Sequence, residues 1–404
     1  MNNISQYKPI VGEEVIEDLY LLAEKLSGKV IQNISATAVG GGVAEILHTI
    51  IPRLKDLGVD ARWDLIKGGE DFFKVTKKLH NALHNRYAEI LEKDFEIYLT
   101  TIDKNAKEIS FYGDIIFVHD PQPAALIQKK AELHSKWIWR CHIDLSEPQE
   151  HAWNFLKKFI TQYDTSVFTA SQFAQPLPIP QVIIPPSIDP LSDKNKELSE
   201  HFIERILDKH GIKREKPIIT QVSRFDKLKD PLGVIETYRT VKKSIECQLL
   251  LIGGSAADDP EGSAVLAEVN EKATVDRDIH ILTDLYDEEV NALQRASDVI
   301  LQKSIKEGFG LTVTEALWKE KPVVASATGG IPLQIKHNVT GLLCHSISGA
   351  AYWVKQLLKY PKYAKELGRN GREHVKYNFL ITRHIKDCML LFLSMDKQGD
   401  IIQL

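Results

Sequence analysis

Short apolar runs of β-type residues recur along the whole chain, and longer amphipathic stretches separate them. Several runs are almost continuously apolar, as expected for strands that are covered on both faces. Strands that alternate with helices favour parallel, doubly wound sheets, so the sequence predicts an α/β fold. The predicted strands lie at 30–34, 61–66, 115–118, 137–141, 167–169 and 182–184, then at 218–222, 248–252, 279–282, 299–302, 323–325 and 342–344.

A proline-rich and polar stretch divides the strands into two series. Pro185-Pro186, Pro190 and the run Ser192-Asp193-Lys194-Asn195-Lys196 are typical of a linker. A chain of 404 residues is long enough for two such domains. We predict two Rossmann-like domains facing across a cleft, at 1–190 and 213–378, with a linker at 191–212. The apolar tail at 379–404 is predicted to form a helix that docks on the N-terminal domain.

The charge and cysteine content exclude several classes of protein. Lys plus Arg is 51 and Asp plus Glu is 55, and the net charge of −4 gives no reason to expect nucleic acid or an anionic membrane as partner. Cys141, Cys247, Cys344 and Cys388 are scattered, which disfavours a zinc site or a disulfide framework. The first residues lack the basic and then apolar pattern of a secretory signal, so none is expected, and no apolar run reaches about 18 residues. A cytoplasmic location is expected.

The segment from Glu307 to Glu315 places two carboxylates around a glycine-containing turn between a predicted strand and a predicted helix. Backbone amides at a helix start suit a phosphate, and the flanking carboxylates suit sugar hydroxyls. The segment therefore indicates a nucleotide-sugar site, whose amides come from Phe309, Gly310, Leu311 and Thr312. A capping box from Thr312 to Glu315 would explain the second carboxylate equally well, but Glu307 has no such structural explanation.

Two basic residues follow the predicted strand at 218–222. Arg224 and Lys229 lie where ligands bind in open α/β sheets, beyond the carboxyl end of a strand. Arg224 could contact a diphosphate as a fork and Lys229 as a point charge. The alternative is a solvated basic turn.

A run of three glycines, Gly40-Gly41-Gly42, opens the first amphipathic helix after the strand at 30–34. Such a loop is flexible and rich in backbone amides, so Gly41 and Gly42 are candidate binding residues. The run is neither a G-x-G-x-x-G motif nor a P-loop. A plain strand-to-helix turn remains the alternative.

Two polar clusters follow strands of the first half. One contains His119 and Asp120, and the other contains Arg140, His142 and Asp144. Histidine is often only a packing residue, but two His/Asp clusters at strand ends also suit a binding cleft. No ligand spacing typical of zinc occurs, and no G-x-S-x-G elbow supports a serine hydrolase.

Together these motifs resemble the retaining glycosyltransferases of the GT-B fold. The pair Glu307 and Glu315 matches the E-x7-E motif of that family, Arg224 and Lys229 match its basic pair, and His142 matches its first-domain histidine. More narrowly, the sequence is similar to trehalose glycosyltransferring synthases. The segments that carry this second resemblance are 40–48, 119–125, 139–144 and 185–190.

The resemblance implies a GT-B architecture in which the first domain faces the acceptor and the second binds the nucleotide sugar. It implies transfer of glucose from UDP- or ADP-glucose to free D-glucose, giving α,α-trehalose reversibly and with retention. No protein ligand to a metal is implied, although Mg²⁺ can accompany the nucleotide. A homodimer is expected. The partners are then a nucleotide-sugar donor and a small sugar acceptor.

The roles that the resemblance implies fall into three groups. Arg224 and Lys229 would neutralise the leaving diphosphate, Glu307 would hold donor glucose hydroxyls, and His142 would orient the transferring sugar. Donor binding would involve Gly41, Gly42, Phe309, Gly310, Leu311, Thr312 and, at the ribose, Glu315. Acceptor binding would involve Asp120, Arg140 and Asp144.

The sequence departs from the family pattern at two positions. Ser223 and Asp230 stand where the family usually has glycine, which questions the shape of the loop around the two basic residues. Three alternatives stay open: a retaining trehalose phosphorylase, a GT-B transferase with another acceptor, and a non-catalytic protein that binds sugar nucleotides or acts as a scaffold.

Overall fold

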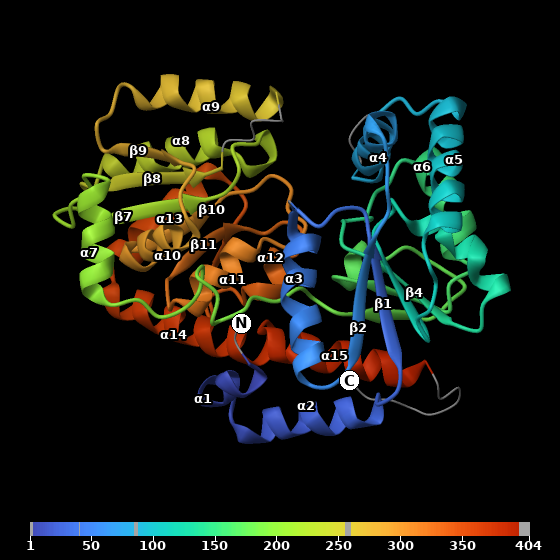
Figure 1. The fold of residues 1–404 in the computed structure, drawn as a ribbon. Coiled ribbons are helices and arrows are strands. Elements are labelled where there is room, and N and C mark those ends of the chain that lie inside the picture. The colour runs from blue at the N-terminus through green and yellow to red at the C-terminus, as the bar shows by residue number, and fades with distance from the viewer. Residues whose placement is uncertain (1–2, 40, 85–87, 255–259, 396–404) are drawn as a thin grey trace. The chain divides into compact units, whose positions relative to one another are not determined.

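The computed structural model describes residues 3–39, 41–84, 88–254 and 260–395. The chain forms two compact units, each built around its own parallel sheet (Figure 1). Unit 1 comprises residues 1–186 together with 381–404, and unit 2 comprises residues 187–380. The predicted α/β class with two doubly wound sheets is confirmed.

The sheet of unit 1 has six strands in the order β2-β1-β3-β4-β5-β6, and every pairing is parallel. Each strand predicted in the first half is present. The bounds are β1 Val30–Ser35, β2 Asp60–Leu65, β3 Ile115–His119, β4 Lys136–Cys141, β5 Thr165–Phe168 and β6 Gln181–Ile183.

Helices cover both faces of this sheet because successive strand residues point to opposite sides. On one face, Ile116 and Val118 of β3 join a buried cluster with α4, α5, η2 and α6. On the other face, Phe117 meets Phe392 of α15 with ring centroids 5.7 Å apart. The helices are η1 Ile4–Tyr7, α1 Lys8–Val11, α2 Glu13–Lys25, α3 Gly41–Asp56, α4 Glu70–Leu83, α5 Glu92–Glu108, η2 Ala124–Glu132, α6 Glu150–Ile160, η3 Ser171–Phe173 and α15 Ile381–Ser394.

The sheet of unit 2 also has six parallel strands, in the order β12-β11-β10-β7-β8-β9. These are the strands predicted in the second half. The bounds are β7 Ile218–Val222, β8 Gln248–Gly253, β9 Ile279–Thr283, β10 Val299–Gln302, β11 Val323–Ser326 and β12 Leu342–Cys344.

This second sheet is likewise covered on both faces. Leu249 and Leu251 of β8 pack with α8, α9 and α13, whereas Leu250 and Ile252 pack with α7 and α10. The helices are α7 Glu200–Lys209, η4 Lys227–Lys229, α8 Pro231–Lys242, α9 Pro260–Ala273, α10 Asp287–Ala296, α11 Leu311–Trp318, α12 Ile331–Gln334, α13 Ile347–Lys359 and α14 Pro361–Asn378.

The strand orders place the candidate motifs at favourable positions. In unit 2 the order reverses between β7 and β10, and in unit 1 it reverses between β1 and β3. Ligands in open α/β sheets bind outside the carboxyl ends of the strands at such a switch point. The loops that follow β7 and β10 carry Lys229 and Glu307, and the loop after β3 carries Asp120.

The predicted linker at 191–212 is wrong for most of its length. Ser199 caps α7, and Ile203, Ile206 and Leu207 of this helix lie in a buried cluster of unit 2. The division between the units falls at Pro186 instead. The polar run Ser192–Lys196, which suggested a linker, instead lies against α10, where Asn291 donates to Asp193 O and Lys196 O.

The C-terminal segment returns to unit 1. Helix α15 packs against α2 and α3, and Figure 1 shows it in red beside these blue helices. Residues 396–404 of the predicted tail lie outside the described residues. None of the described helices combines the length and the apolar character that a membrane crossing requires.

Candidate active site

The loops after β7 and β10 bring Lys229 and Glu307 together. Lys229 Nζ lies 2.6 Å from Glu307 Oε1, although 78 residues separate them in sequence. Ser304 donates its hydroxyl hydrogen to Glu307 Oε2 over 2.9 Å. Glu307 is only 7% exposed, so both carboxylate oxygens are held within a largely buried network.

Glycines allow the backbone of the Glu307 loop to meet the loop after β11. Gly329 has a φ of +54°, and a Cβ there would lie 1.5 Å from the carbonyl oxygen of Glu307. Gly330 N donates to Gly308 O over 2.8 Å. At these contacts the backbones of the two loops touch directly, so no side chain fits between them.

Helix α11 begins at Leu311, which contradicts the predicted capping box. Its N-cap is Gly310, with a φ of +84° and no side-chain cap. Thr312 is therefore the second residue of the helix rather than its cap, and Glu315 lies beyond the first turn. Glu315 is 6% exposed, and helix capping no longer explains its carboxylate.

Sequence reasoning missed two buried residues that support this segment. Gln334 of α12 donates to Phe309 O over 2.5 Å and accepts from the Thr314 hydroxyl over 2.6 Å. Lys319 lies one turn after Glu315 and donates to Gln294 Oε1 over 2.7 Å. Burial lowers the pKa of Lys319 to about 7, while the negative charge of Glu315 opposes the shift. The i,i+4 spacing of Glu315 and Lys319 was the available signal.

Arg224 and Asp230 flank the lysine on the loop after β7. The Arg224 side chain is 67% exposed and pairs with Asp226 at 3.7 Å, so the structure does not bring it to Glu307. Asp230 has a φ of +50°, in the left-handed region that glycine adopts most readily. It accepts from Gly233 N over 3.0 Å as the N-cap of α8 and pairs with Lys303. The departure at this position is therefore accommodated.

In unit 1, a hydrogen-bonded chain of side chains runs from β1 through β3 to the residue that follows β4. Asn33 Oδ1 lies 3.1 Å from His119 Nε2, and His119 Nδ1 lies 3.1 Å from His142 Nε2. Asn33 donates its amide to Arg62 O, so its oxygen faces His119 and must accept. It follows that His119 donates from Nε2, that His142 donates from Nε2, and that His142 Nδ1 remains an acceptor.

The imidazole rings of His119 and His142 are both neutral near pH 7. Burial, with a contribution from the charge of Arg140, holds the pKa of His119 and of His142 well below the usual range. Asp120 supports the same turn, because its Oδ1 accepts from His142 N over 2.8 Å. Burial raises the pKa of Asp120 to about 7.

Arg140 and Asp144, predicted to bind the acceptor, make interior contacts. The Arg140 guanidinium is 2% exposed and donates to His384 over 3.0 Å and to Ile184 O over 3.1 Å. Asp144 Oδ1 accepts from Ser146 N over 2.8 Å. Acceptor binding by these two residues stays a prediction.

The glycine run lies at the start of α3. Gly40 is outside the described residues, Gly41 begins the helix, and a Cβ at Gly42 would meet nothing within 4 Å. Close packing therefore does not explain the glycine at 42. Donor binding by Gly41 and Gly42 also stays a prediction.

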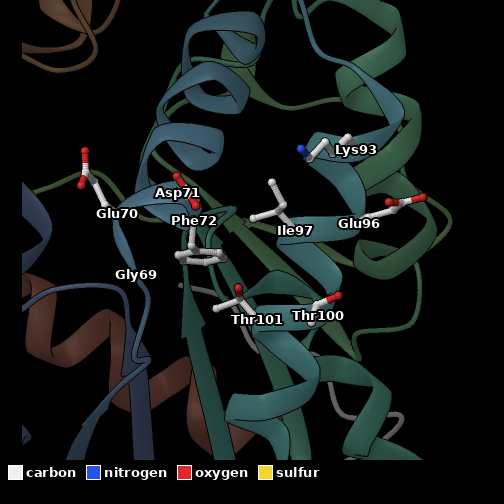
Figure 2. Close-up of a pocket in the computed structure, with 9 residues that line it drawn as sticks. All are labelled: Gly69, Glu70, Asp71, Phe72, Lys93, Glu96, Ile97, Thr100 and Thr101. Atoms are coloured by element: carbon white, nitrogen blue, oxygen red, sulfur yellow. The ribbon is translucent and has the colours of Figure 1, made fainter.

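Unit 1 has an open hollow of about 530 Å³ between the start of α4 and the middle of α5 (Figure 2). None of the predicted site residues lines it, so it is separate from the histidine chain. The lining residues are Gly69, Glu70, Asp71, Phe72, Lys93, Glu96, Ile97, Thr100 and Thr101.

Two family models match the chain. The model described as trehalose synthase, N-terminal domain, matches residues 33–175, which lie in unit 1. The model described as glycosyl transferases group 1 matches residues 202–374, which lie in unit 2.

Similar proteins extend this likeness over the full fold. A trehalose synthase of Pyrococcus horikoshii is 48% identical over 391 residues, covering 95% of this chain and 94% of the relative. A trehalose synthase of Rubrobacter xylanophilus is 43% identical over 403 residues, covering 97% of each. The solved sucrose-phosphate synthase of Thermosynechococcus elongatus superposes with a TM-score of 0.73 at 18% identity, over 91% of this chain and 99% of that one.

Proposed function

The chain belongs to the trehalose synthase family of group 1 glycosyltransferases, and we propose that it transfers glucose from a nucleoside-diphosphate glucose to free D-glucose. The product is α,α-trehalose, formed reversibly with retention of the α configuration. The donor is UDP- or ADP-glucose.

The Lys229–Glu307 pair carries this proposal. A cation and a carboxylate 2.6 Å apart, at the switch point of a doubly wound sheet, suit a ligand that joins a phosphate to a sugar. The lysine can neutralise a phosphate, and the buried carboxylate beside it can accept hydrogen bonds from the hydroxyls of a sugar. The pair therefore supports a nucleotide sugar over a plain nucleotide.

In unit 2, we assign the charged side chains of the site to binding of the donor. Lys229 and the exposed Arg224 neutralise the leaving diphosphate, with the first amides of α11 adding their dipoles. Glu307 accepts hydrogen bonds from hydroxyls of the donor glucose, and Glu315 accepts from the ribose. The glycine-rich start of α3 in unit 1 provides further amides for the donor.

In unit 1, the neutral His142 contributes an acceptor. Its Nδ1 can accept a hydroxyl hydrogen of the transferring sugar, because Nε2 already donates to His119. Asp120 holds the backbone of this turn, and a glucose acceptor would bind near it.

The transfer needs no covalent intermediate on the protein. The acceptor hydroxyl attacks the anomeric carbon as the bond to the phosphate oxygen breaks, and its proton passes to that oxygen. Within the described ranges, no group of three or more His, Cys, Asp or Glu side chains could hold a metal ion. We keep the proposal that Mg²⁺, where it takes part, binds through the nucleotide.

Product analysis tests the reaction. The protein is incubated with UDP-, ADP- or GDP-glucose and with glucose, fructose or no acceptor, and the products are identified. We expect trehalose with UDP- or ADP-glucose and glucose. Another disaccharide would contradict the acceptor, and trehalose cleavage that needs phosphate rather than a nucleoside diphosphate would favour a phosphorylase.

A matched pair of variants tests the site. Glu307→Gln should lower kcat/KM at least 100-fold, because the amide has no charge and keeps only one of the two acceptor oxygens that the carboxylate offers to the donor hydroxyls. Glu289→Gln is the control: this carboxylate is also buried in unit 2 and lies 2.6 Å from Lys209 Nζ. Both variants neutralise a buried carboxylate that pairs with a lysine, but only the first should lose transfer. Equal loss of activity in both would remove Glu307 from the site.

A further inference from the structure

The loop that follows β10 contains a buried hydroxyl group directed at the proposed site. Ser304 is 2% exposed and donates to Glu307 Oε2 over 2.9 Å. An ionised carboxylate only accepts hydrogen bonds, so the serine must be the donor. Ser304 thus holds the oxygen of Glu307 that Lys229 does not contact.

Gln302, the last residue of β10, orients this serine. Gln302 Nε2 lies 3.2 Å from Ser304 Oγ and donates to it, and Gln302 is 1% exposed. With a lone pair of Oγ engaged in this way, the hydroxyl hydrogen points to Glu307. In the described part of the chain the other amide atom, Gln302 Oε1, is buried without a partner. Among the described residues, the Gln302 side-chain amide therefore hydrogen-bonds to Ser304 alone.

Lys229 cannot fix the carboxylate in the same way. An ammonium group is a point charge on a flexible stem, with three rotatable donors. In the proposed function the same ammonium also faces the diphosphate of the donor. A hydroxyl on a short, buried side chain beside a rigid strand has far less freedom, so it determines the plane of the carboxylate.

The backbone around the serine is also fixed. Ile305 N, next in sequence, donates to Leu228 O over 2.7 Å, which ties the β10 loop to the turn that carries Lys229. We propose that Ser304, oriented by Gln302, is a positioning residue that holds the carboxylate of Glu307 in register with the hydroxyls of the donor glucose. This inference rests on the proposed role of Glu307.

Ser304→Ala tests the inference by binding as well as by turnover. Affinities for UDP or ADP and for the matching NDP-glucose are measured by calorimetry. We expect unchanged NDP affinity but a loss of about 10-fold in NDP-glucose affinity, and a fall in kcat of about 10- to 100-fold, as for losing one hydrogen bond to a charged group. Gln302→Met should act in the same direction more weakly.

Ser297→Ala is the matched control. Ser297 is also 2% exposed and stands just before β10, at the end of the strand opposite to Ser304, where its hydroxyl donates to Leu293 O. It should lose thermal stability without changing either affinity or kcat. Ser304→Thr, which keeps the hydroxyl, should regain NDP-glucose affinity even if the added methyl group lowers stability.

The outcomes separate this inference from the proposed function. If Ser304→Ala folds and keeps wild-type kcat and the wild-type preference for NDP-glucose over NDP, the positioning role is wrong. Equal losses for Ser297→Ala would also overturn it. If wild-type protein binds NDP-glucose but makes no trehalose, the proposed reaction fails while the binding comparison still decides the role of Ser304. If wild-type protein binds no NDP-glucose, the proposed function and the positioning role of Ser304 are both wrong.

Discussion

Single residues of the candidate site differ in what holds them. Glu307 is fixed at both oxygens, by Lys229 and by Ser304. Arg224 is largely exposed and can move toward a phosphate at little cost. Asp120 is held in a left-handed backbone conformation, with a φ of +68°. The carboxylate that would meet the sugar is therefore held by two hydrogen bonds, whereas the arginine that would meet the leaving group is largely exposed.

The raised pKa of Asp120 predicts a pH-dependent stability. Burial raises this pKa from 3.8 to about 7, so the folded protein binds the proton more tightly than the unfolded chain. The carboxyl therefore costs stability increasingly as pH rises from about 4 to about 7. Asp120→Asn keeps an oxygen that can accept from His142 N. Its Tm, relative to wild type, should rise between pH 5 and pH 8.

Asp94→Asn gives the opposite control. Burial tends to raise the pKa of Asp94, but the hydrogen bond from Leu91 N and the ion pair with Lys78 outweigh it and lower the pKa. Its stabilising effect is complete above about pH 4 and is lost only below that pH. Scanning calorimetry should show a Tm loss for Asp94→Asn that is constant from pH 5 to pH 8. A pH-independent result for Asp120→Asn would show that Asp120 is ionised throughout.

At the level of elements, the site depends on three loops that follow β7, β10 and β11. Ile305 N donates to Leu228 O and joins the first two, and Gly330 N donates to Gly308 O and joins the last two. Side-chain pairs add to these backbone contacts, because Lys229 meets Glu307 and Asp230 meets Lys303. The catalytic candidates are thus positioned by backbone contacts between loops as much as by their own strands.

Gly329→Ala should disrupt this arrangement. A Cβ there would lie 1.5 Å from Glu307 O, so the Glu307 loop must shift, and the variant should lose several degrees in Tm together with NDP-glucose binding. Gly211→Ala is the control, because Gly211 has a φ of +67° with nothing within 4 Å of its Cβ position. It should lose only about 1 kcal/mol, from backbone strain. Equal behaviour of the two variants would contradict the steric argument.

At the scale of the whole molecule, the chain builds unit 1, then unit 2, and returns to unit 1 with α15. This last helix covers the face of the first sheet opposite to α4, α5 and α6. His384 accepts from the buried Arg140, and Phe392 packs against Phe117. Unit 1 therefore cannot complete its core until the final helix has been made.

Phe392→Ala should destabilise unit 1 by about 3–5 kcal/mol, the usual cost of removing a buried phenyl group. Lys386→Ala on the same helix breaks only an exposed pair with Asp18 and should cost less than about 1 kcal/mol. Limited proteolysis of both variants measures the difference. Equal protease resistance would mean that α15 adds little to unit 1.

Much of this architecture could be predicted from the sequence alone. Each predicted strand exists within two residues of its expected bounds. The inner strands are almost continuously apolar because helices cover both of their faces, whereas the edge strands β2 and β6 are more exposed. The loops that carry Lys229, Glu307 and Asp120 follow these strands, as the sequence predicted. Family resemblance supplied the roles, and the residues supplied their order along the chain.

The geometry of the site could not be predicted from local sequence patterns, because it depends on contacts between distant segments. The signal at Thr312 predicted a helix start, but α11 starts at Leu311 because Gly310 is left-handed where the Glu307 loop meets Gly329. Ser304 and Lys229 converge on Glu307 only once β7 and β10 lie side by side. Strand identity is thus set by local hydrophobicity, whereas the geometry of the site is set by packing between segments that no window of sequence contains.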